Sequence, residues 1–465
     1  MFPAMDRAAA ELLVASLFVD PSAERLAALK QRSAAVTNWD TLLNAAQGHG
    51  VVGLLRHNLD AAGVELPASI APVLAARASE AGDAGQRARL ALQQILSAAA
   101  VENLDVTLVG ASSYAFDLYA DRALRRPGLL ELHVRARDLR TALRAAEVAG
   151  LLPEPRSLPA WWYRGTALPL PLAPSSSLLC RARLHTRLHH PSLLLGVREA
   201  EVRERRKRFS HEGWSVHVLD PIDRVLDHAV RLAASAGDKL LLPGRRGLVE
   251  AASDPGHPLR LDLVLDLATA IERFLADLPV AAVLERARQW RAEAPLSAAL
   301  QCLQSGLGFV APARDWARSV AMDLARGPRG VAQPNALPAT FRPDPIERLP
   351  LWARPTEDFL VRRYAIERAT RPALARAQAL HYATLLVQGT VALLGLPIAL
   401  VQRWMDRGQR DEALARAQSP QRQTDVVDAW RASQRLEQQK AITPRTLALP
   451  PPEEGAQRYP DHYAG

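Results

Sequence analysis

The pattern of apolar and polar positions divides the chain into a helical first part, a strand-rich middle and a helical later part. Residues 8–104 carry apolar residues at helical spacing in three runs: "AAAELLVASLF", "NWDTLLNAAQGHGVVGLLRHNL" and "APVLAARASEAGDAGQRARLALQQILSAAAVENL". Asn38 and Asp40 offer side-chain oxygens near a predicted helix start at Trp39, and Gly63 marks a break after the second run. Residues 1–104 are therefore predicted to form an N-terminal helical region.

Short β-type runs begin at residue 105. "DVTLVG" predicts a strand that ends at Gly110, and "ASSYAFDLYA" predicts a helix directly after it. "GLLELHV", residues 128–134, predicts a second strand, which a helix over 138–149 follows. Alternating runs at 178–188 and 214–220 predict two more strands. This order of strands and helices predicts an α/β core over residues 105–222.

Helical patterns resume at residue 223 and continue to about 326, which predicts a helical domain over 223–326. Residues 327–356 are rich in proline and predict a linker or surface-crossing arm, followed by a C-terminal extension over 357–465. Within that extension, residues 383–401 carry no charge and would span roughly 28 Å as a helix. Two interpretations stay open: the segment associates with a membrane or a membrane-bound protein partner, or it packs as a buried helix against protein.

Composition excludes some classes of function. The net charge is +9 and 48% of residues are hydrophobic. Almost all the basic residues are arginines dispersed along the chain, so a nucleic-acid partner is not expected. The dense stretch at 198–209 alternates Glu and Arg, as on a solvated helix face, with a phosphate or lipid-headgroup contact as the alternative. Cys180 and Cys302 match no disulfide or zinc spacing, and the N-terminus lacks the pattern of a signal peptide. These features predict a cytoplasmic protein, with anchoring at the inner membrane through 383–401 as the alternative.

The order of segments resembles a family of uncharacterised bacterial nucleotidyltransferases, distant relatives of the DNA polymerase beta superfamily that are often found near polysaccharide and natural-product clusters. The resemblance runs from about Trp39 to about Gly308. It is carried by the tryptophan-led helix pair "NWDTLLNAAQGHGVVGLLRHNL", the core "VTLVGASSYAFDLYADRALRRPGLLELHV" and the later helix "RLDLVLDLATAI". It implies a small mixed-sheet nucleotidyltransferase-like core, flanked by N- and C-terminal helical domains.

The resemblance also implies positions for an active site. Family members usually carry Lys-Gly at the end of the first strand, Asp-x-Asp on the second, and a further Asp before Leu-His on a third. In this sequence the Lys is Val109 and the Gly is kept as Gly110. Two of the three carboxylate positions are occupied by Leu129 and Arg183, and Glu131 stands at the remaining one.

Nucleotidyl transfer uses two Mg²⁺ ions to clamp a nucleoside triphosphate, and Mg²⁺ requires oxygen ligands. Leu129 supplies none, and Arg183 would place a cation where the metal charge should lie. We therefore consider Glu131 as the remaining metal ligand and catalytic carboxylate, or alternatively as a strand residue that faces water, Arg125 or Arg126. Arg183, which replaces a carboxylate, could pair with Glu131 across adjacent strands.

The other polar residues near these strands have two interpretations each. Gly110 and Ser112 could cradle a phosphate at a helix N-terminus, or form a plain strand-to-helix turn. His133 shares the strand parity of Glu131 and could line the same cleft, or be a hydrogen-bonded structural residue. His185, His189 and His190 are close in sequence, but Pro191 and the lack of a neighbouring carboxylate in sequence argue against a metal site.

The sequence thus supports three hypotheses of function. The first is a nucleotidyltransferase-family protein with degenerate metal-binding carboxylates, of low or no activity, in a polysaccharide or natural-product biosynthetic context. The second is an active enzyme that uses Mg²⁺ and a nucleoside triphosphate to transfer a nucleoside monophosphate to a small molecule, sugar or peptide. The third is a membrane-associated scaffold or interaction subunit that needs no cofactor.

Overall fold

The computed structural model describes most of the chain up to residue 326. Described are residues 7–326 without 120, 122, 155–156, 158, 161–162, 165–167, 177–178, 190–192, 194, 212–213, 238–239, 241–243, 255–256, 258 and 308–310, together with residues 360, 371–383, 397–398 and 401. The predicted linker 327–356, most of the apolar segment 383–401 and the tail beyond it lie outside the described residues. Among the described residues, no helix has both the length and the apolar character needed to cross a membrane.

The N-terminal region forms five helices, as the periodicity predicted. Asn38 caps the helix that starts at Trp39, because its side chain accepts a hydrogen bond from the backbone N–H of Thr41. Ser22 caps the preceding helix in the same way, through the N–H of Arg25. The helices are α1 (Arg7–Ala15), α2 (Ala23–Ser33), α3 (Trp39–Gly48), α4 (Val52–Ala61) and α5 (Ala71–Val101).

The middle of the chain forms a mixed sheet of seven strands in the order β3-β4-β5-β2-β1-β7-β6, which confirms the mixed-sheet α/β prediction. β2 runs parallel to β5 and antiparallel to β1, and β1 runs parallel to β7. The strands are β1 (Thr107–Leu108), β2 (Leu130–His133), β3 (Leu151–Pro153), β4 (Leu170–Pro174), β5 (Ala182–His185), β6 (Lys207–His211) and β7 (Trp214–Val218).

Three of these strands were not predicted. β3 and β4 contain prolines, which weaken a strand signal, and both lie at or next to one edge of the sheet, where proline is tolerated. β6 overlaps the end of the stretch 198–209 that we predicted as one solvated helix face. In the structure that stretch forms a short helix, α9 (Glu199–Arg205), and then the first residues of β6.

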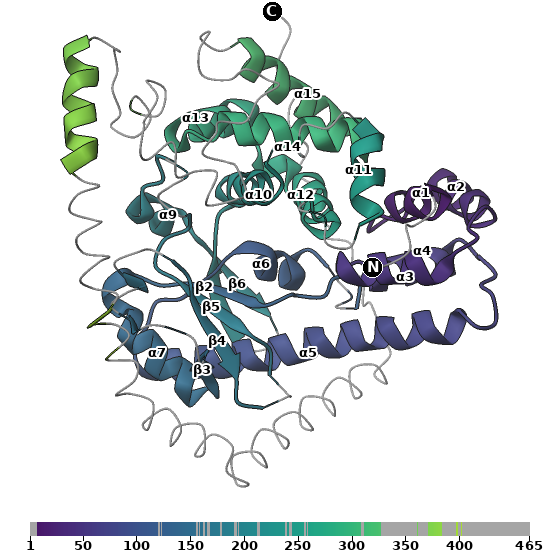
Figure 1. The fold of residues 1–465 in the computed structure, drawn as a ribbon, viewed down its shortest axis with the longest axis horizontal. Coiled ribbons are helices and arrows are strands. Elements are labelled where there is room, and N and C mark those ends of the chain that lie inside the picture. Colours follow the sequence, from purple (N-terminus) through teal and green to yellow (C-terminus); the bar gives the residue numbers. More distant parts are fainter. Residues whose placement is uncertain are drawn as a thin grey trace, which may run out of the picture. The chain divides into compact units, whose positions relative to one another are not determined.

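Helices pack around the sheet and against one another (Figure 1). α5 packs on α7 (Leu139–Val148) and reaches β7, whereas α6 (Gly110–Asp117) contacts β2 and the later helices α10 (Pro221–Ala236) and α12 (Leu261–Arg273). α10 also packs on α14 (Glu293–Gly306) and α13 (Val280–Trp290). The remaining elements are η1 (Ala136–Asp138), α11 (Gly244–Ala252), η4 (Leu275–Asp277) and α15 (Ala311–Arg326).

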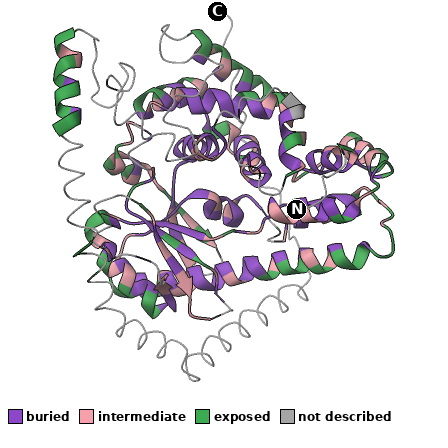
Figure 2. Ribbon diagram, viewed as in Figure 1, coloured by how far each residue is buried: buried purple, intermediate pink, exposed green. Residues whose placement is uncertain are grey.

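One hydrophobic core joins the first helices to the last ones. Leu12 and Leu13 of α1 and Leu248 of α11 are fully buried in the same cluster, and α1 packs directly on α11. Figure 2 shows the buried positions continuing through α10, α12 and α14. Burial on this scale is the main favourable contribution to folding. The N-terminal helices are therefore packed into the same core as the later helices.

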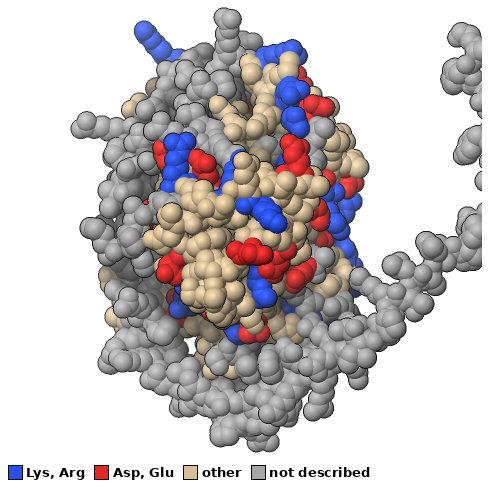
Figure 3. Space-filling model, turned by 90° about the vertical axis from the view of Figure 1, so that its right-hand side faces the viewer, with Lys and Arg blue, Asp and Glu red and all other residues tan. Residues whose placement is uncertain are grey.

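Charged residues of both signs are intermixed on the described surface in Figure 3. Two arginines of the 198–209 stretch are not simply solvated: Arg206 donates to the Asp105 carboxylate from two nitrogens at 2.9 Å, and Arg205 pairs with the buried Asp223 at 3.1 Å. These two side chains hold α9 and β6 to the core, which corrects the prediction of a free helix face.

Candidate functional site

Four polar side chains lie on one face of the sheet where β2 and β5 run side by side. Glu131 of β2 is in register with Arg183 of β5, and His133 is in register with His185. Alternate residues of a strand share a face, and residues in register on neighbouring strands share the same face. The arrangement brings together the positions at which the sequence predicted a site.

Gly110 forms the turn from β1 into α6 and lies directly against Glu131. Its φ is +61°, and a Cβ atom built on it would stand 1.9 Å from Oε2 of Glu131. Any other residue would therefore have to displace the carboxylate, and would also adopt a backbone conformation that side chains disfavour. Glycine is kept here because the Glu131 carboxylate approaches the backbone so closely.

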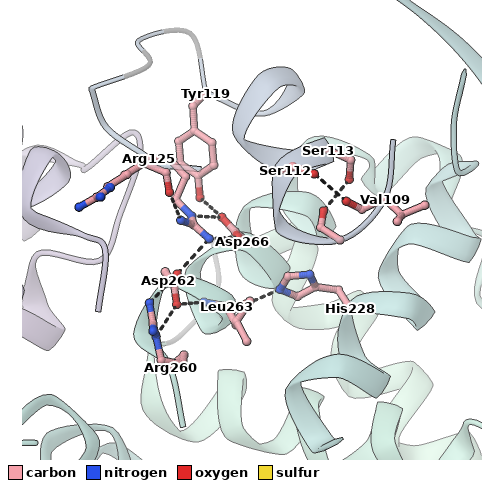
Figure 4. Close-up of polar contacts among 12 residues, drawn as sticks. Val109, Ser112, Ser113, Tyr119, Arg125, His228, Arg260, Asp262, Leu263 and Asp266 are labelled. Carbon is pink, nitrogen blue, oxygen red and sulfur yellow. Dashed lines mark hydrogen bonds and ion pairs between the residues drawn. The ribbon is translucent and has the colours of Figure 1, made fainter. Parts of the chain in front are cut away.

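The Ser112 hydroxyl is engaged by the protein's own backbone. It donates to the carbonyl oxygen of Val109 at 2.9 Å, accepts from the N–H of Glu131 at 3.1 Å, and is completely buried. Ser113 donates to the carbonyl oxygen of Gly110 at 2.8 Å (Figure 4). These bonds tie the end of β1, the start of α6 and β2 together, which is the role of a plain strand-to-helix turn.

Glu131 is held by an arginine and a histidine of the protein itself. Nη1 of Arg231, on α10, lies 2.9 Å from Oε1 of Glu131, and Nε2 of His185 lies 3.2 Å from the same oxygen. Burial on its own would raise the pKa of Glu131, but Arg231 and His185 outweigh that effect and hold the pKa well below its usual range. The carboxylate is thus ionised and already paired.

Arg231 links Glu131 to a second buried carboxylate. Its Nε donates to both oxygens of Asp227, at 3.0 and 2.9 Å, and the Asp227 side chain is 1% exposed. His189 lies on the other side of Asp227, with Nε2 at 3.3 Å from Oδ1. Glu131, Arg231, Asp227 and His189 therefore form one continuous chain of contacts from the sheet into α10.

The histidines of this region are paired with carboxylates rather than grouped around a metal. His133 Nε2 lies 3.1 Å from Glu199, whose other oxygen accepts the N–H of Leu188 at 3.0 Å. Burial lowers the pKa of His185 and lowers that of His189 to about 4, which keeps both imidazoles neutral near pH 7. Within the described part of the chain, no group of three or more His, Cys, Asp or Glu side chains converges as a metal site would require.

Arg183 stands beside Glu131 but is not its ion-pair partner. The side chain is exposed, and its charge contributes to the low pKa of Glu131, after the effects of burial, Arg231 and His185. Arg125 and Arg126, the other arginines considered for Glu131, also do not pair with it among the described contacts. The pairing cation is Arg231, which lies 100 positions away in sequence and which sequence reasoning missed.

Arg125 instead forms the centre of a second buried network. The side chain is 1% exposed and reaches both oxygens of Asp266 at 2.9 and 2.8 Å, and Asp262 at 3.1 Å. Tyr119 donates to Asp266 at 2.8 Å (Figure 4). The two aspartates, four positions apart on the largely apolar first part of helix α12, were the signal in the sequence that an internal cation would be needed.

A third cluster lies at the start of α10. Asp220 caps the helix by accepting the N–H of Asp223, and Asp223 is fully buried between Arg205 and Arg286. Burial and the neighbouring Asp220 raise the pKa of Asp223 to about 6, although both arginines act in the opposite direction. This cluster joins α9, α10 and α13.

The donor set around Glu131 does not fit a pair of Mg²⁺ ions. Two such ions need several free carboxylate oxygens, whereas Oε1 of Glu131 faces Arg231 and His185, and Oε2 lies against Gly110. Leu129, half-buried just before β2, adds no oxygen. In this arrangement the guanidinium of Arg231 occupies one oxygen of Glu131.

Comparison with known proteins gives one match. A family model described as uncharacterised nucleotidyltransferase matches residues 35–308. No curated protein and no solved structure matches the chain.

Proposed function

The chain belongs to the family of uncharacterised nucleotidyltransferases, and from this premise we propose that it is a member with a degenerate metal site and low or no nucleotidyl-transfer activity. The reaction of such enzymes is attack on the α-phosphorus of a nucleoside triphosphate, with two Mg²⁺ ions as the clamp. We further propose a biosynthetic context, the assembly of a polysaccharide or natural product, in which its acceptor would be a small molecule, sugar or peptide.

The observation that carries the proposal is the ion pair between Glu131 and Arg231. A Mg²⁺ ion that bound Oε1 of Glu131 would have to displace Arg231, and Arg231 is also held by both oxygens of Asp227. Breaking a buried pair by removing one partner costs about 3–5 kcal/mol. The displaced guanidinium would in addition lie close to a doubly charged ion, and this repulsion further opposes binding of the metal.

The loss of carboxylates supports the same proposal. Leu129 and Arg183 stand at positions where the family resemblance implies metal-binding aspartates, and Arg183 brings a second positive charge to the face that Glu131 occupies. Arg231 pairs with both Glu131 and Asp227, so the chain itself supplies the cation that these two carboxylates face.

A second candidate is an active nucleotidyltransferase, and one specific observation favours it. The Gly110 turn, with its positive φ, still lies against a carboxylate on the next strand. If the Arg231 side chain rotates away when a substrate binds, Glu131 could ligate a single metal ion. This candidate predicts metal-dependent binding of a nucleotide.

Calorimetric titration of the full-length protein with each nucleoside triphosphate, with and without Mg²⁺, separates the two candidates. We expect no sub-millimolar, Mg²⁺-dependent binding in the wild type, and no change in Glu131→Ala. The Arg231→Gln variant removes the competing cation, and Arg208→Gln, on the exposed strand β6, is the matched control. Sub-millimolar binding that needs Mg²⁺ and disappears in Glu131→Ala would overturn the degenerate-site proposal and support the active enzyme.

A further inference from the structure

Among the described strands, β6 forms one edge of the sheet, and it lacks the short length and the proline found at the other edge. It is the last strand in the sheet order, and Lys207, Arg208 and Ser210 are exposed. The opposite edge, β3, has three residues, ends in Pro153, and begins with the fully buried Leu151. Proteins limit pairing at a sheet edge with short strands, proline or charged side chains. β6 has five residues and no proline, and of these features it carries only the charges of Lys207 and Arg208, which oppose a basic strand but not an acidic one.

The backbone groups of β6 alternate between the sheet and the open side. β6 pairs with β7, and His211 faces Trp214 at the end where the two strands are joined. Two residues separate His211 from Trp214, and in a hairpin of this length the two residues that flank the turn exchange both of their backbone hydrogen bonds. Along β6, every second residue from His211 then bonds to β7 in the same way. Lys207 and Phe209 therefore bond to β7, and the backbone N–H and C=O groups of Arg208 and Ser210 point away from the sheet.

An aromatic surface lies beside this edge. Phe209 and His211 stack on each other at 6.0 Å between ring centroids, and Trp214 meets them edge-on at 5.8 and 5.7 Å. All three side chains are half-buried rather than enclosed. A side chain of an added strand would find an apolar surface on this face of the sheet.

The charge of β6 favours an acidic occupant. The strand carries Lys207 and Arg208 and no carboxylate, and no described carboxylate lies within ion-pair distance of either. Arg208 bonds to Ser215 Oγ at 2.8 and 3.0 Å, which keeps it positively charged at the surface. A second copy of this chain would bring four cations onto two adjacent strands, so self-pairing is disfavoured.

We propose that β6 is a docking edge for an extended, acidic segment of a partner protein. The segment adds as an eighth strand, with backbone hydrogen bonds to Arg208 and Ser210. Its apolar residues lie on the face that carries Phe209 and Trp214, and its carboxylates lie on the other face beside Arg208, with Lys207 adding positive charge at the end of the strand. This surface is separate from the Glu131 site and does not depend on whether that site is catalytic.

The test uses full-length protein and two synthetic peptides, an alternating Glu-Val hexapeptide and its Lys-Val counterpart. We expect calorimetry to detect binding of the Glu-Val peptide alone. The Ser210→Pro variant, which removes one outward N–H, and the double charge reversal Lys207→Glu with Arg208→Glu should each weaken it about tenfold or more, a change of ~1.4 kcal/mol. Ser210→Ala, which keeps the N–H, should bind as the wild type does.

Hydrogen exchange of the wild type keeps the test valid even if Ser210→Pro fails to fold. The acidic peptide should slow exchange at Arg208 and Ser210 but leave Phe209 unchanged, because its N–H is already bonded within the sheet. Equal binding of the two peptides, binding unaffected by Ser210→Pro, or slowed exchange at none of the β6 amides would overturn the proposal. Concentration-dependent dimerisation that the charge reversal abolishes would also overturn it, since the edge would then serve a second copy.

Discussion

The chain of contacts from Glu131 through Arg231 to Asp227 can be tested by replacing Arg231 with methionine, which keeps much of the volume and removes the charge. The Arg231 side chain is 18% exposed, and those of Glu131 and Asp227 are 12% and 1% exposed. Removing one partner of a buried pair costs about 3–5 kcal/mol. His185 and His189 stay next to the two carboxylates and can take up protons, so we expect a loss near 3 kcal/mol, the lower end of that range.

The loss should depend on pH, with a sign that follows from the pKa of Glu131. In the wild type this pKa is depressed, so the stabilisation is present above the usual pKa of a glutamate and is lost only as pH falls through the depressed value. In Arg231→Met the main cation is gone, and burial should raise the pKa of Glu131. The folded variant then binds a proton more readily than its unfolded chain, so its disadvantage at pH 7 should shrink at pH 5.

Urea unfolding followed by far-ultraviolet circular dichroism, at pH 7 and at pH 5, measures both effects. The matched control is Arg198→Met, because the Arg198 side chain is 78% exposed and bonds only to a surface glutamate among its described contacts. We expect no resolvable loss in that control. The reasoning is refuted if Arg231→Met behaves like Arg198→Met at pH 7, or if its loss is the same size at pH 5.

Three further predictions concern other parts of the molecule. Because the pKa of Asp223 is raised to about 6, its contribution to stability is fully present below the pKa of an unfolded aspartate and is lost as pH rises through 6. In Asp223→Asn the melting temperature should therefore change less between pH 5 and 7.5 than it does in the wild type. A dependence on pH as steep as that of the wild type would contradict this. Gly110→Ala should lower the melting temperature by several degrees, because backbone strain of roughly 1–2 kcal/mol adds to displacement of the Glu131 carboxylate. Gly128→Ala is the control and should not lower it, because no atom lies within 4 Å of the added Cβ. Equal effects of the two substitutions would disprove the close approach of Glu131 to Gly110. Deleting everything after residue 356 should leave a folded, soluble core and should remove any membrane association, which cell fractionation measures. A full-length chain that is wholly soluble and monomeric would argue instead that residues 383–401 pack on protein.

The sequence was informative where the signal is local. The cap at Asn38 and the parity that places Glu131 and His133 on one face both depend on residues a few positions apart. Gly110 was predicted to end a strand, and it does lie at the turn from β1 into α6. Such patterns follow directly from the geometry of a helix turn or a strand, so predictions made from them agree with the folded structure.

The partners of the site were not predictable, because they come from distant segments. Arg231 lies 100 positions from Glu131, and nothing near either residue indicates the other. The proximity of Arg125 and Arg126 to Glu131 in sequence suggested the wrong cation, since Arg125 is turned toward α12. β6 was missed for a different reason: an alternation of charged residues satisfies a helix face and an exposed edge strand equally well.

The buried Arg125 also sets an order of events during protein synthesis. Its carboxylate partner Asp266 follows 141 positions later, and the Asp262 carboxylate arrives only shortly before it. At about 5–20 residues per second, a ribosome needs roughly 7–28 s to add that length of chain. During this interval the Arg125 guanidinium, which is buried in the folded protein, has been synthesised but its partners Asp262 and Asp266 have not. Burial of Arg125 together with both of its carboxylate partners therefore has to wait until α12 has been synthesised.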